Sequence, residues 1–222
     1  MKLFLDTADL DDVRWAATSG LIDGVSTDPS RLAVGAGDQD HRQHLAALCA
    51  LVRGPVTAPV LSVTADDIYR EGKELARISD AIVVEVPMIE EGLVATARLA
   101  ADGVRVNVTL VFSAAQALLA ARTGAHFVSP FIGRLDEVGA NGLGVASDIR
   151  QIFDNYSLEC EILASSIRTP RHVVEVAKLG VDAAAVPPNV LRALILHPLT
   201  DVGLDHFLND WSKRIARERA AT

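Results

Sequence analysis

Short apolar segments alternate with longer amphipathic segments along almost the whole chain, and this alternation constrains the fold more than any other feature. Eight of the apolar segments are typical of strands: residues 2–6, 24–26, 56–63, 81–87, 105–109, 125–128, 161–164 and 182–186. Regular alternation of strand and helix favours a parallel sheet, which is either doubly wound or closed into a barrel. Eight units favour the barrel, and no Gly-x-Gly-x-x-Gly turn follows the first strand to support a dinucleotide-binding sheet.

We therefore expect an α/β fold, a (β/α)8 TIM barrel with an extra C-terminal helix at about residues 200–219. The chain has 222 residues, half of them hydrophobic, which suits one domain over residues 1–222. We also expect Ser30 to cap the segment that follows Pro29, a helix over residues 39–52, and a glycine-rich loop from residue 129 to Gly144.

The bulk charge and hydropathy exclude several function classes. The net charge is −8 and no Lys/Arg cluster occurs, which argues against binding to nucleic acid. No apolar run reaches the ~18 residues of a membrane helix, and no charged-then-apolar leader opens the chain. We therefore expect no membrane partner and a cytoplasmic location.

Polar side chains stand where several of the expected strands end. Catalytic groups of a (β/α)8 barrel come from the carboxyl ends of its strands, so these positions are the first candidates for a site. The set comprises Asp6, Asp28, Glu85, Asn107 with Thr109, Ser129 with Arg134, Ser165 with Ser166 and Arg168, and Asn189. The barrel would bring three carboxylates and two arginines to one face.

Glu85 is the least expected of these residues, because it lies in the apolar run 81–87. An ionised carboxylate in a dry strand costs several kcal/mol, so it must be paired, neutral through a raised pKa, or at a wet strand end. Asp6 and Asp28 each have a structural alternative. Asp6 could cap the first helix through Thr7, and Asp28 precedes Pro29 as turn residues often do.

Arg134, Ser166 and Arg168 follow the sixth and seventh strands, close to where barrels often hold phosphate. Arginine binds phosphate through two parallel donors, and the amino end of a helix that begins at Pro170 would favour an anion. The alternative is that both arginines pair with surface carboxylates such as Asp136 and Glu137. The histidines show no metal-ligand or catalytic-triad spacing, and we interpret them as structural.

Five stretches, in order, make the sequence resemble the small transaldolase and fructose-6-phosphate aldolase family over essentially its whole length. They are residues 4–8 (Phe-Leu-Asp-Thr-Ala), 24–30 (Gly-Val-Ser-Thr-Asp-Pro-Ser), 107–113 (Asn-Val-Thr-Leu-Val-Phe-Ser), 128–136 (Val-Ser-Pro-Phe-Ile-Gly-Arg-Leu-Asp) and 164–168 (Ala-Ser-Ser-Ile-Arg). The resemblance implies an imine between a lysine and a ketose phosphate, with the lysine in a Val-Val-Lys-Val-Pro stretch on the fourth strand.

The lysine position of that stretch holds Glu85 in this chain, which reads Val-Val-Glu-Val-Pro. A carboxylate cannot condense with a ketone, and we expect none of the four lysines to reach the site. Two further departures from the family pattern are Asp28 in place of asparagine and a third strand without the glutamate or glutamine that helps to hold a catalytic water. The other site residues match the family: Asp6, Asn107, Thr109, Ser129, Arg134, Ser166 and Arg168.

We therefore predict an enzyme that uses proton transfer, of the isomerase or epimerase type, on a phosphorylated sugar. The expected catalytic residues are Glu85, Asp6, Asp28 and Thr109, and the expected substrate-binding residues are Asn107, Ser129, Arg134, Ser166 and Arg168. Two alternatives stay open: a silent sugar-phosphate-binding or partner protein, and aldolase-type C–C chemistry without an imine.

We expect no cofactor, with a variant in which Asp6, Asp28 and Glu85 hold Mg²⁺ or Mn²⁺. We also expect a homo-oligomer, because relatives assemble through the terminal helix. In this chain that helix carries an apolar stripe, Leu204, Phe207, Leu208 and Trp211, which suits docking on its own barrel or on a neighbour.

Overall fold

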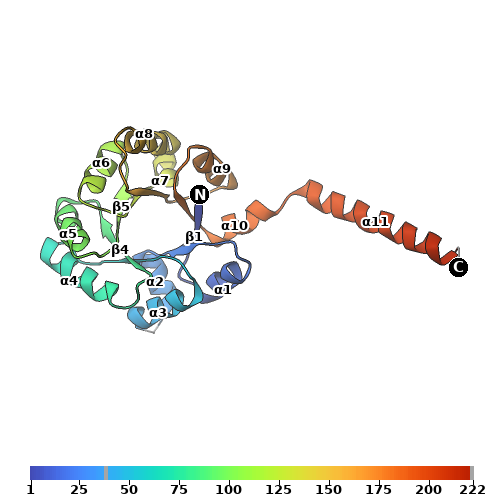
Figure 1. Cartoon of the computed structure of the whole chain (residues 1–222), viewed down its shortest axis with the longest axis horizontal. Helices are drawn as coiled ribbons and strands as arrows, with labels where there is room; N and C mark the ends of the chain where they lie inside the picture. Colours follow the sequence, from blue (N-terminus) through green and yellow to red (C-terminus); the bar gives the residue numbers. More distant parts are fainter. Residues whose placement is uncertain (38–39, 221–222) are drawn as a thin grey trace.

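Eight parallel strands close into a barrel in chain order in the computed structural model, which describes residues 1–37 and 40–220 (Figure 1). The strands are β1 (Lys2–Asp6), β2 (Gly24–Ser26), β3 (Val56–Pro59), β4 (Ile82–Pro87), β5 (Val106–Val111), β6 (Phe127–Pro130), β7 (Glu161–Ala164) and β8 (Ala183–Val186). The predicted (β/α)8 barrel is confirmed. Each predicted strand corresponds to one of these.

Helices surround the ring of strands on its outside (Figure 1). They are α1 (Leu10–Thr18), α2 (Pro29–Ala36), α3 (His41–Leu51), α4 (Ala65–Ala76), α5 (Glu90–Ala101), α6 (Ala114–Arg122), α7 (Ile132–Glu137), α8 (Gly142–Asn155), α9 (Pro170–Lys178), α10 (Pro188–Ile195) and α11 (Pro198–Ala220).

Alternation along each strand decides which side chains point into the barrel. A cluster of buried apolar side chains that includes Phe4, Val83 and Phe127 fills the lower part of the interior, and the rings of Phe4 and Phe127 meet edge to face with centroids 5.8 Å apart. Two residues further along the same strands come Asp6, Glu85 and Ser129. The period of two thus places the polar residues directly above a packed apolar floor.

Three local expectations are corrected. Asp28 caps α2 by accepting a hydrogen bond from Arg31 N, so Ser30 is not the cap. Pro59 ends β3 four residues earlier than predicted, because proline cannot donate to the sheet. Within the expected glycine-rich loop lies the short helix α7. The start of α7 was not predicted, because no side chain caps this end of the helix and the sequence carries no capping motif there. The expected start of α3 at Gln39 lies outside the described residues.

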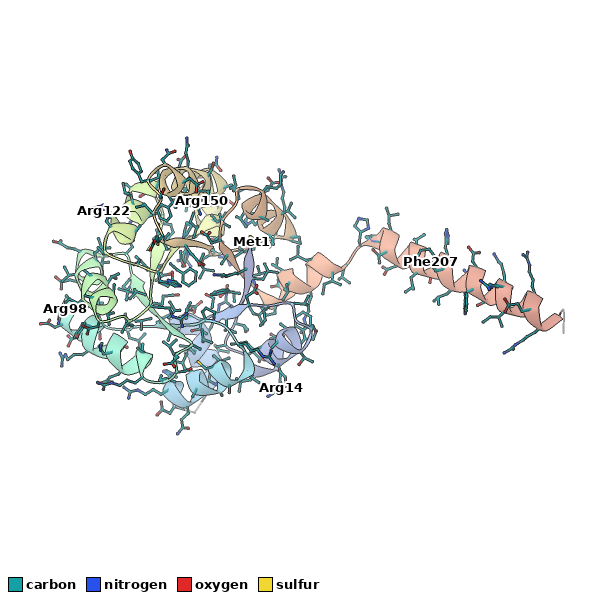
Figure 2. The ribbon with its side chains drawn as sticks, in the orientation of Figure 1. Met1, Arg14, Arg98, Arg122, Arg150 and Phe207 are labelled. Carbon is teal, nitrogen blue, oxygen red and sulfur yellow. The ribbon has the colours of Figure 1, made fainter. Side chains whose placement is uncertain are left out.

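The terminal helix α11 extends away from the barrel, and Figure 2 shows Phe207 well clear of it. The four residues of the apolar stripe, Leu204, Phe207, Leu208 and Trp211, are all exposed. The predicted extra helix is therefore present, but the structure does not dock it on its own barrel. None of the helices in the described chain is long and apolar enough to cross a membrane.

Candidate active site

A cavity of about 780 Å³ opens at the carboxyl end of the barrel, and a smaller one of about 90 Å³ shares part of its lining. Asp28, Arg31, Glu85, Thr109, Phe131 and Arg134 line both. The two cavities therefore form one continuous region at the barrel mouth, the position expected for an active site of this architecture.

Seven of the nine predicted site residues line the smaller cavity: Asp6, Asp28, Glu85, Thr109, Arg134, Ser166 and Arg168. They come from β1, β4, β5, α7 and the loops after β2 and β7. The other two, Asn107 and Ser129, line neither cavity and are almost completely buried. The structure places these two residues behind Glu85 rather than at the surface that a ligand would touch.

Asn107 and Ser129 form a hydrogen-bonded chain that ends on Glu85. The Oγ of Ser129 donates to Oδ1 of Asn107 at 2.9 Å, and Nδ2 of Asn107 donates to Oε2 of Glu85 at 3.0 Å. Glu85 and Asn107 are direct neighbours in the β4–β5 register, which explains why their side chains meet.

Burial raises the pKa of Glu85 to about 8, from 4.5 for an ordinary glutamate. The hydrogen bonds from Asn107 and Thr109 oppose this rise, and the negative charges of Asp28 and Asp6 reinforce it. Glu85 is therefore predominantly protonated at pH 7. A neutral carboxylic acid avoids the free-energy cost of an ionised carboxylate in an apolar strand. This is the raised-pKa solution, one of the three that the sequence allowed.

Asp6 also has a raised pKa, but it differs from Glu85 in having a cationic partner. Burial raises the pKa of Asp6 to about 6, while its ion pair with Arg31 lowers it and the charge of Asp28 raises it. Nη2 of Arg31 donates to Oδ2 of Asp6 at 2.7 Å. At pH 7 Asp6 is mainly ionised and Glu85 mainly neutral, so one of these two carboxyls can act as a base and the other as an acid.

Arg31 is the site residue that sequence reasoning missed. Its Nε lies 3.0 Å from Oδ2 of Asp28, so the guanidinium touches two of the three carboxylates. The available signal was its position three residues after the helix cap Asp28, a spacing that brings side chains together on the first turn of a helix. The structural alternative for Asp28 holds as well, since the same carboxylate both caps α2 and faces the cavity.

Arg134 and Arg168 both line the smaller cavity, and the segments that carry them pack closely together. The N–H of Gly133 donates to the carbonyl of Ser166 at 3.0 Å, and a Cβ at position 133 would lie only 2.2 Å from that oxygen. Ser166 adopts a φ of 58°, a conformation rare outside glycine that often marks functional loops. This contact joins α7, which carries Arg134, to the loop that carries Arg168.

Arg168 also pairs with Glu137, with Nη2 and Oε1 2.9 Å apart, so the alternative of a surface ion pair applies to one of the two arginines. Both side chains of that pair are about half exposed, and such pairs contribute little free energy. Asp136 instead accepts from the N–H of Gly142 and contacts His172. An anion in the cavity can therefore compete for Arg168 at small cost.

The four lysines of the chain all lie away from the cavity. Lys2 pairs with Glu161 at the amino end of the barrel, and Lys73, Lys178 and Lys213 pair with acids on or beside outer helices. The residues at the barrel mouth thus include no amine that could form an imine with a ketose.

No group of three or more His, Cys, Asp or Glu side chains in residues 1–37 and 40–220 is arranged to hold a metal ion. Asp6 and Asp28 instead share the guanidinium of Arg31. The variant in which Asp6, Asp28 and Glu85 bind a divalent cation stays a prediction.

A closed (β/α)8 barrel with acid, base and arginine side chains at the carboxyl ends of its strands has the architecture of a barrel enzyme. Residues 3–220 match the model of the family described as Transaldolase/Fructose-6-phosphate aldolase, and the chain belongs to this family.

Several curated relatives are about half identical to this chain and are named probable transaldolase. The relative from Hyphomonas neptunium is 51% identical, covering 96% of this chain and 98% of its own. The relative from Phenylobacterium zucineum is 49% identical, covering 96% of this chain and 97% of its own. The relative from Desulfotalea psychrophila is 48% identical, covering 96% of this chain and 99% of its own. These names favour transaldolase over isomerase for the relatives.

Proposed function

We propose that this protein catalyses proton transfer next to the carbonyl of a phosphorylated sugar, the enediol chemistry of isomerases and epimerases. The observation that carries the proposal is Glu85: a buried carboxylic acid, neutral at pH 7, stands where family chemistry uses an amine. With no imine to withdraw electrons, the reaction that the remaining groups support is acid–base catalysis. Asp6, ionised in the same cavity, supplies the base.

The proposed step needs only these two carboxyl groups. The Asp6 carboxylate removes a proton from the carbon next to the substrate carbonyl. The electron pair of that C–H bond forms a C=C bond, and the π electrons of the carbonyl move to its oxygen. Glu85 donates its proton to the resulting oxyanion, which gives a neutral enediol. The order of the two pKa values favours Asp6 as the base and Glu85 as the acid at neutral pH. Thr109, which lines both cavities, would position a hydroxyl or water.

The substrate class follows from the arginine side of the cavity. Arg134 and Arg168 point to a phosphate group, since guanidinium groups match phosphate oxygens in pairs. We expect the double substitution Arg134→Ala with Arg168→Ala to weaken binding of a ketose phosphate by about 10²-fold or more, since hydrogen bonds to charged groups contribute about 1.5–3 kcal/mol each.

Calorimetric titration with fructose 6-phosphate and inorganic phosphate measures this loss. The matched control is Arg192→Ala, which removes an arginine that pairs with Asp12 on the outside of the barrel. Unchanged affinity in the double variant would overturn the phosphate assignment.

Two other functions are separated from this one by a single experiment. Aldolase-type C–C bond chemistry without an imine is favoured by the names of the relatives, and a silent binding protein would retain the arginines without turnover. Ketose and aldose phosphates are incubated with the protein in D₂O, with and without Mg²⁺ or Mn²⁺, and followed by NMR. Deuterium uptake at the carbon next to the carbonyl supports proton transfer. Cleavage products support the aldolase route, and binding without either supports the silent protein.

We further propose that α11 packs against a second copy of the chain. Its apolar stripe is exposed, and an isolated helix has little stability in water without a surface to cover it. We expect Phe207→Glu with Trp211→Glu to reduce the assembled mass, measured by light scattering after gel filtration. Asp205→Lys, on the same helix outside the stripe, should leave the mass unchanged. A wild-type protein that runs as a monomer would contradict the proposal.

A further inference from the structure

We propose that Arg31 is the positioning residue that divides the acid and base roles between Asp6 and Glu85. Its guanidinium bridges Asp6 and Asp28 and leaves Glu85 without a cationic partner in the described chain. The assignment of catalytic roles rests on the proposed function, whereas the effect of Arg31 on the two carboxyl groups does not depend on turnover.

The position of Arg31 follows from local structure. Pro29 begins α2 directly after the cap Asp28, so Arg31 lies on the first turn of the helix and its side chain reaches back over the ends of β1 and β2. Its Nη2 donates to Asp6 at 2.7 Å and its Nε lies 3.0 Å from Asp28, although that N–H is buried and makes no hydrogen bond. The stronger contact is therefore with Asp6.

Different charged and polar groups act most strongly on each of the two carboxyls. Asp6 faces the cations Arg31 and Arg168 and the anion Asp28. Glu85 faces Asn107 and Thr109 on β5 and the anions Asp28 and Asp6. Asp6 is thus stabilised as an anion by a cation in hydrogen-bond contact, whereas Glu85 meets only neutral donors and like charges.

This difference orders the two protonation steps. Of these two carboxyls Asp6 ionises first, because Arg31 lies beside it, and its charge then disfavours ionisation of Glu85. Without Arg31 both carboxyls would be buried acids with like-charged neighbours only, apart from Arg168 beside Asp6. The asymmetry on which separate base and acid roles depend would be largely lost.

The test is a carboxyl titration of the full-length protein that carries ¹³C-labelled aspartate and glutamate side chains, followed by NMR. The signals are assigned by their absence in Asp6→Asn and Glu85→Gln. In Arg31→Met we expect the pKa of Asp6 to rise by about one unit or more, a tenfold change in proton affinity, because an opposite charge within hydrogen-bond distance shifts a carboxyl by about 1–3 units. The pKa of Glu85 should fall, because its neighbour is no longer charged.

Two further variants make the result specific. Arg31→Lys restores the charge and should return the pKa of Asp6 most of the way to its wild-type value. Arg192→Met removes an arginine from a pair on the barrel exterior and should change neither titration. If Arg31→Met does not fold, Arg31→Gln supplies the same loss of charge with a polar side chain.

An Asp6 titration that is the same in wild type and Arg31→Met or Arg31→Gln would overturn the inference. Deuterium exchange separates this failure from failure of the proposed function. A wild type that shows no exchange refutes the function, yet the titration still decides the role of Arg31. A wild type that exchanges should show its rate rise at higher pH in Arg31→Met, because ionised Asp6 then forms at higher pH.

Discussion

Glu85→Gln should reduce the rate of deuterium exchange into a bound sugar phosphate by about 10²- to 10⁴-fold, the range typical for removal of a general acid or base. Glutamine has the shape of glutamic acid and can still accept the hydrogen bond from Nδ2 of Asn107, but it cannot donate an acidic proton. Affinity for the sugar phosphate should change little, because the arginines remain. NMR measures the rate of deuterium exchange, and calorimetric titration measures the affinity for the sugar phosphate.

The matched control for this prediction is Glu161→Gln. That carboxylate pairs with Lys2 at the amino end of the barrel, so its substitution should not change the rate of deuterium exchange. A Glu85→Gln variant that exchanges as fast as wild type would remove Glu85 from the mechanism. Equal loss in both variants would indicate a general effect on folding, which a thermal melt would reveal.

The same substitution should make the protein more stable at alkaline pH. The pKa of Glu85 is about 8 in the folded protein and near 4.5 in the unfolded chain, so between these values the folded state holds a proton that the unfolded state has released. The free energy of unfolding therefore falls as pH rises through this window, by about 1.4 kcal/mol per unit for one group. Glutamine does not titrate, so the free energy of unfolding of the variant does not fall for this reason as pH rises.

We expect Glu85→Gln to gain on the order of 4 kcal/mol relative to wild type between pH 5 and pH 8, measured by urea unfolding at both values. Asp6 makes a smaller contribution of the same sign between its unfolded value near 3.8 and its folded value of about 6, and this is common to both proteins. Parallel pH dependences in the two proteins would show that Glu85 is ionised in the folded state at neutral pH. A variant that is inactive yet more stable would mark Glu85 as retained for function.

The fold was largely predictable because the barrel is determined by a pattern that the sequence displays directly. Parallel strands buried on both faces need continuous apolar runs, and each run produced a strand. The errors fall where the local signal is ambiguous or absent. Asp28 and Ser30 are both acceptable cap residues, and only the structure shows which side chain reaches the N–H of Arg31.

The sequence predicted which residues would come together at the candidate site better than it predicted their arrangement there. Strand ends that are distant in sequence meet in any barrel, which is why Asp6, Glu85 and Arg168 could be grouped in advance. Sequence does not say how deep a side chain lies, so Asn107 and Ser129 were expected to touch substrate although they lie beneath Glu85. Arg31 was missed because its partners depend on how the first turn of α2 leans over the barrel.

The closed ring also has a stereochemical consequence. Asp6 stands on β1 and Glu85 on β4, with two strands between them, so the two carboxyls approach a molecule at the centre from different directions. In the proposed step Asp6 acts on the carbon and Glu85 acts on the carbonyl oxygen, so the hydrogen leaves the carbon on the side of Asp6. Asp6 then holds that proton while Glu85 is ionised, and the proton returns from the same side. Two carboxyls placed in this way thus favour transfer of hydrogen along one face of the sugar over inversion of a single centre.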